Sequence, residues 1–159
     1  MNMLDSATVA KAWIANLSTG AAGVAMSLPA DTDAWASDGF VVVEGVVGTG
    51  GVPGSRLRSP VISIAVYAAT PETVAQGIKP KAPWKVASNI AEIIVRETDR
   101  YFNPEFNPAT LAVSGYENVN VINAYMVTDP VRVPDDTGHL ALYRFNLGLV
   151  WSSNELLNV

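Results

Sequence analysis

The residues that could do chemistry are few, and the most reactive of them stand beside one turn. His139 is the only histidine, and Asp135 and Asp136 precede it by a few positions. A histidine oriented by a carboxylate is the usual general base of an enzyme. However, the stretch 134–138 is typical of a reverse turn, because its proline fixes φ and its glycine accepts a positive φ. Polar side chains are expected in such a turn, so the sequence predicts no catalytic residue.

Metal-binding chemistry is equally restricted. The chain has no cysteine and one histidine, which excludes thiolate sites and leaves carboxylates to supply almost every ligand. Asp31 and Asp33 are two positions apart, but the surrounding residues do not have the spacing of an EF-hand calcium loop. Solvated turn acids are the better interpretation. The sequence therefore predicts no metal site and no cofactor.

A glycine-rich segment, residues 48–55, suggests phosphate binding at first sight. It lacks the Gly-Lys-Ser/Thr ending of a P-loop, and a strand-like run follows it instead of a helix. We interpret residues 48–58 as a projecting loop whose Gly50, Gly51, Arg56 and Arg58 contact a neighbouring subunit or another protein. The alternative is that the two arginines only keep an exposed loop soluble.

Composition limits the classes of partner. Of the 159 residues, 49% are hydrophobic and only 16% are charged, with a net charge of −5. Acidity argues against a nucleic-acid-binding surface, and no apolar run has the length of a membrane span. We also expect no signal peptide at the N-terminus. Sparse charge fits either a large protein–protein interface or a well-packed monomer rich in alanine and valine.

The pattern of apolar residues predicts one α+β domain over residues 1–159. A short helix begins at Asp5 or Ser6, and a long amphipathic helix at about 83–101 carries an apolar stripe that suits packing across a sheet. Strands are expected at 22–28, 40–47, 60–68, 119–128 and 139–151, the last two forming a long antiparallel hairpin at about 119–151. The sheet is expected to be mostly antiparallel.

Alternation along the strands predicts which side chains share a face. In the final strand, residues 141 to 151 at every second position form an apolar face. In the strand before it, strict alternation places Val119, Val121, Tyr125 and Val127 on one face and Ile122, Ala124 and Met126 on the other. Asp129-Pro130 then interrupts that strand, because proline cannot donate to a ladder.

These runs resemble a known family. Residues 39–43, the segment 48–54 and the strand-like run 59–68 are similar to the tail terminator (tail-completion) proteins of long-tailed bacteriophages. The segment Lys81-Ala82-Pro83-Trp84-Lys85-Val86-Ala87, followed by Ile90-Ala91-Glu92-Ile93-Ile94, resembles the Pro-Trp and helix segment of actinobacterial-phage members. The similarity covers about residues 5–100.

The resemblance implies a non-enzymatic α+β subunit that forms a ring, usually a homohexamer. Such a ring caps the tail tube and joins it to the neck, so the implied partners are further copies of the chain, the tail tube protein and a neck or connector protein. The implied location is the virion, and the host cytoplasm during assembly. DNA would cross the ring only as passing cargo, which an acidic channel repels.

Two other hypotheses stay open at this point. The first is a head–tail connector or head-completion protein on the portal side of the neck. The second is a small α+β enzyme or ligand-binding domain with a pocket under the long helix and His139 as its base.

Overall fold

The computed structural model describes residues 4–50, 57–71, 82–101, 109–134 and 140–153. Its elements, in chain order, are α1 (Ser6–Ala15), β1 (Val24–Ala25), the 3₁₀ turn η1 (Thr32–Ala34), β2 (Phe40–Gly50), β3 (Ser59–Ala69), α2 (Pro83–Arg100), β4 (Ala109–Val113), β5 (Tyr116–Met126), β6 (Val131–Val133) and β7 (Leu140–Ser153).

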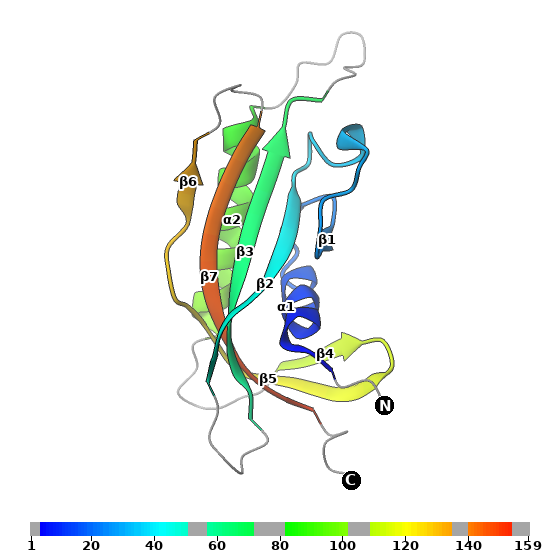
Figure 1. Ribbon diagram of the computed structural model, residues 1–159, viewed down its shortest axis with the longest axis vertical. Coiled ribbons are helices and arrows are strands. Elements are labelled where there is room, and N and C mark those ends of the chain that lie inside the picture. Colours follow the sequence, from blue (N-terminus) through cyan, green and yellow to red (C-terminus); the bar gives the residue numbers. More distant parts are fainter. Residues whose placement is uncertain (1–3, 51–56, 72–81, 102–108, 135–139, 154–159) are drawn as a thin grey trace.

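The strands form one curled sheet in the order β1-β2-β3-β7-β5-β4, with β6 beside β7. All pairings are antiparallel except β1 with β2. The long strands β2, β3 and β7 run along the molecule, while β4 and β5 cross its lower end (Figure 1). The α+β fold and the mostly antiparallel sheet are confirmed.

Both helices lie on one face of the sheet and share its main core. The N-cap of α1 is Asp5, whose Oδ1 accepts a hydrogen bond from the Thr8 amide at 2.7 Å. Trp13 on α1 is fully buried, and its ring meets Tyr101 edge-on at 4.7 Å between centroids. The predicted N-terminal helix is confirmed.

The long helix α2 begins at Pro83, where the missing N–H costs nothing, and Tyr101 follows its last residue. It buries five side chains against the sheet: Ala87, Ile90, Ala91, Ile94 and Thr98. The sheet contributes mainly β-branched and aromatic residues from β2, β3 and β7 to the same core. The predicted helix and its apolar stripe are confirmed, although the stripe also includes Thr98.

The predicted faces of β5 are wrong beyond Val121. The pairing of β5 with β7 shifts register between Val121 and Asn123, which marks a β-bulge. A bulge adds one residue and reverses the alternation. Ala124 and Met126 therefore join Val119 and Val121 on the helix side. For β7, whose register with β3 is unbroken, the predicted apolar face is confirmed.

On the edge of β7 that does not face β3, the pairing strand stops at the end of β5 and resumes as β6. The amides of Val127 and Thr128 both donate to the Asn146 carbonyl, and Thr128 Oγ1 accepts from the Asn146 amide at 2.8 Å. The threonine side chain thus replaces a backbone acceptor where the ladder breaks. The antiparallel pairing expected for the hairpin and its break at Asp129-Pro130 are confirmed, while residues 135–139, which include most of the expected turn, lie outside the described part of the chain.

The prediction of a loop over residues 48–58 is wrong at both ends, where the chain is paired with a neighbouring strand. The β2–β3 ladder continues through Gly48↔Val61 to Gly50↔Ser59, and Arg58 forms a bridge with Trp151 of β7. Register shifts at Glu44 and Val47 give β2 two bulges, the places in a strand where glycine is tolerated. Residues 51–56 lie outside the described part of the chain.

Candidate interaction surface

The sheet has one face covered by the helices and one that is only partly covered, which we call the open face. At one end of the open face, a small apolar cluster forms around Trp35, which follows η1. Its ring meets Tyr67 of β3 edge-on at 6.4 Å between centroids. Further along β2, β3 and β7 the open face carries polar and exposed side chains instead.

An ion pair crosses the open face at the centre of the sheet. Arg144 of β7 holds Glu44 of β2 with two hydrogen bonds, Nε to Oε1 at 2.8 Å and Nη2 to Oε2 at 3.1 Å. Ser63 of β3, between them, donates from its hydroxyl to Glu44 Oε1 at 2.9 Å. The pair therefore links three neighbouring strands through side chains alone.

The surroundings of this pair stabilise the charged form of both side chains. Hydrogen bonding from Arg144 lowers the pKa of the Glu44 carboxyl, partial burial opposes this, and the Ser63 hydroxyl lowers it further. The hydrogen bond to Glu44 likewise raises the pKa of Arg144. A bidentate carboxylate–guanidinium pair with an added donor has its polar groups satisfied, so it tolerates being covered by a partner.

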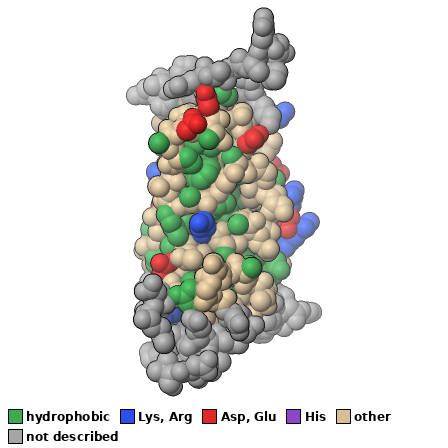
Figure 2. Space-filling view, turned by 90° about the vertical axis from the view of Figure 1, so that its right-hand side faces the viewer, with side chains coloured by type: hydrophobic (Ala, Val, Ile, Leu, Met, Phe, Trp, Pro, Cys, Tyr) green, Lys and Arg blue, Asp and Glu red, His purple; other side chains and the backbone are tan. Residues whose placement is uncertain are grey.

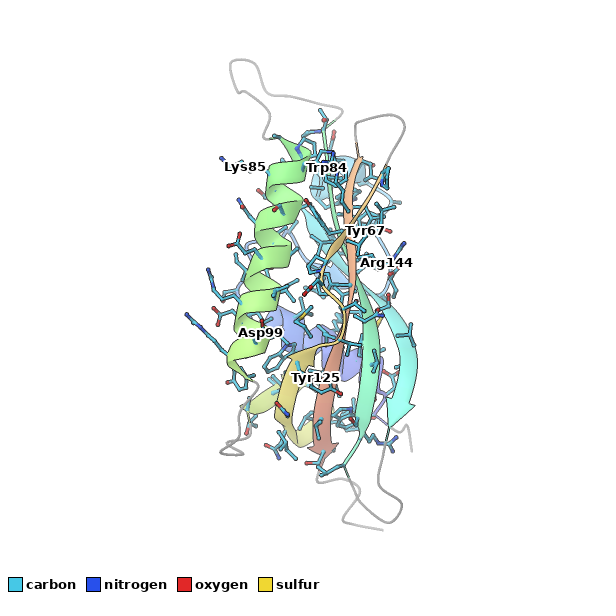
Figure 3. All side chains as sticks on the ribbon, turned by 90° about the vertical axis from the view of Figure 1, so that its left-hand side faces the viewer. Tyr67, Trp84, Lys85, Asp99, Tyr125 and Arg144 are labelled. Atoms are coloured by element: carbon cyan, nitrogen blue, oxygen red, sulfur yellow. The ribbon has the colours of Figure 1, made fainter. Side chains whose placement is uncertain are left out.

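An exposed apolar side chain stands beside the ion pair, and another lies on the nearby connection. Val131 of β6 pairs directly with Arg144, so the two side chains stand on the same face of the sheet, and Val131 is 62% exposed. Val127, on the connection between β5 and β6, is 45% exposed. Figure 3 shows Tyr67 and Arg144 along the strands beside α2, with Tyr125 below them. Val131 is thus an exposed apolar side chain beside a charge that Glu44 already neutralises.

Two further exposed apolar side chains lie near the far end of β2 and just before β3. Val47 is 60% exposed and Leu57 is 38% exposed. Arg58 exchanges two backbone hydrogen bonds of 2.9 Å with Trp151 and places its guanidinium 5.7 Å from the centroid of that ring. The Trp151 indole N–H in turn donates to Ser6 Oγ at 3.0 Å, which anchors this end of the sheet to α1.

The four predicted contact residues have different outcomes. Gly50 is a strand residue paired with Ser59, and Arg58 is held against Trp151, so neither is part of an irregular loop. Gly51 and Arg56 lie outside the described residues. The sequence reasoning missed Glu44 and Arg144, and the one available signal was that each charge interrupts an otherwise apolar strand.

A second contact missed from the sequence ties β6 to α2. The Arg132 guanidinium lies over the Trp84 ring, 3.7 Å from its centroid, and Trp84 meets Tyr143 edge-on at 5.6 Å. Figure 3 shows Trp84 at the strand side of α2 and Lys85 on its outer side. The stack fixes the short strand β6, and with it Val131, against the first turn of α2.

The candidate chemical residues beside the predicted turn fall outside the described structure. His139, Asp135 and Asp136 lie outside the described residues. Among those that are described, no group of three His, Cys, Asp or Glu side chains could hold a metal ion. The hypothesised pocket under the long helix lies where Ile64, Ile94 and Phe145 are almost fully buried.

No helix in the described part of the chain is both long and apolar enough to cross a membrane. Comparison of the sequence with protein-family models gives no match. Comparison with curated proteins gives no match either.

Proposed function

We propose that this chain is a structural virion protein, a tail terminator that assembles as a ring, caps the tail tube of a long-tailed phage and joins it to the neck. The proposal starts from the sequence resemblance over about residues 5–100. The observation that carries it furthest is the open face, where the exposed Val131 stands beside an ion pair that is already neutralised within the chain.

The distribution of polar groups supports an assembly role. Only three described polar residues are buried, Ser63, Thr98 and Ser153, and two of them have identified contacts that hold elements together. Ser63 bonds Glu44 across strands, and Thr98 Oγ1 accepts from the Trp13 indole at 3.4 Å. These two buried hydroxyl groups therefore hold structural elements of the described core together.

Surface composition supports the same proposal. Figure 2 shows the side of the molecule that bears α1 and β1, where hydrophobic and uncharged groups dominate and charged side chains are few, most of them near the upper end and along one edge. Depletion of charge is the compositional mark of protein–protein interfaces. The net charge of −5 also suits a subunit around a channel that DNA must cross without binding.

The test is genetic and morphological. Disruption of the gene in a phage that encodes this chain is expected to give separate heads and tails, with tails of abnormal length, in negative-stain electron microscopy. The wild-type gene supplied in trans restores joined particles. Normal particles in the absence of the gene would refute the proposed function. Unfilled or leaking heads with normal free tails would instead place the subunit on the portal side, as a connector.

A further inference from the structure

We draw no further inference here: the strongest candidate, the open face of the sheet where the exposed Val131 of β6 stands beside the Glu44–Arg144 ion pair, is an unpartnered surface, and nothing in the structure shows what covers it.

Discussion

Gly39 occupies the point where β2, η1 and α2 meet, and its replacement by alanine gives the most specific test of the packing. Its φ is +82°, a conformation that costs an L side chain about 1–2 kcal/mol. A Cβ at this position would stand 2.5 Å from Ile90 Cδ1 and 3.1 Å from the Tyr67 carbonyl oxygen. Ile90 is 3% exposed, so it has little room to move away.

The magnitude follows from a comparison with Gly20, whose φ of +81° is nearly the same but whose added Cβ would meet nothing within 4 Å. Both substitutions carry the same backbone penalty and the same gain from a less flexible unfolded chain, so these effects cancel in the difference. What remains is the cost of overpacking, about 1–3 kcal/mol. We therefore expect Gly39→Ala to be the less stable variant by that amount.

The assay is urea unfolding of both variants, followed by tryptophan fluorescence, with the free energy of unfolding taken from linear extrapolation. The expected result is a lower midpoint for Gly39→Ala and unchanged slopes for both. If the two variants unfold with free energies that agree within about 0.5 kcal/mol, the tight approach of α2 to Gly39 is wrong.

Further predictions concern the core, the ion pair and the aromatic stack. Ile94→Ala is expected to cost about 2–5 kcal/mol in urea unfolding, far more than Ile93→Ala on the half-buried flank, and equal losses would contradict the packing of α2. Glu44→Gln is expected to cost about 1 kcal/mol near pH 7. Because the folded pKa of Glu44 is lowered from 4.5, this difference is present above that pH and disappears as acid protonates the carboxyl, so a pH-independent difference between the two unfolding curves would refute it. Arg132→Ala is expected to cost about 0.5–1 kcal/mol and to change the fluorescence of Trp84, and an unchanged emission spectrum would contradict the stack.

The parts of the fold that could be predicted depend on local periodicity. The apolar stripe of α2 persists over several helical turns, and its buried residues lie on one side of the observed helix. The alternation of β7 persists along the whole strand, and its register with β3 is unbroken. The faces of β5 could not be predicted, because both sides of the strand are apolar and nothing in the sequence marks the bulge after Val121.

The candidate surface depends on contacts that the sequence does not display. Glu44 and Arg144 are one hundred residues apart, and only the order β2-β3-β7 brings them together. Because glycine favours irregular backbone, the glycines at 48 and 50 predict a loop, but pairing with β3 keeps them in the ladder. Tertiary pairing decided the structure at both sites.

The central claim is that this chain acts by assembling with copies of itself. Native mass spectrometry of the full-length protein, alone and with tail tube protein, tests it most directly. The account predicts one closed oligomer whose mass is a whole multiple of the 16.8 kDa subunit. This oligomer is expected to form without a cofactor. A species that remains at 16.8 kDa under both conditions would contradict it.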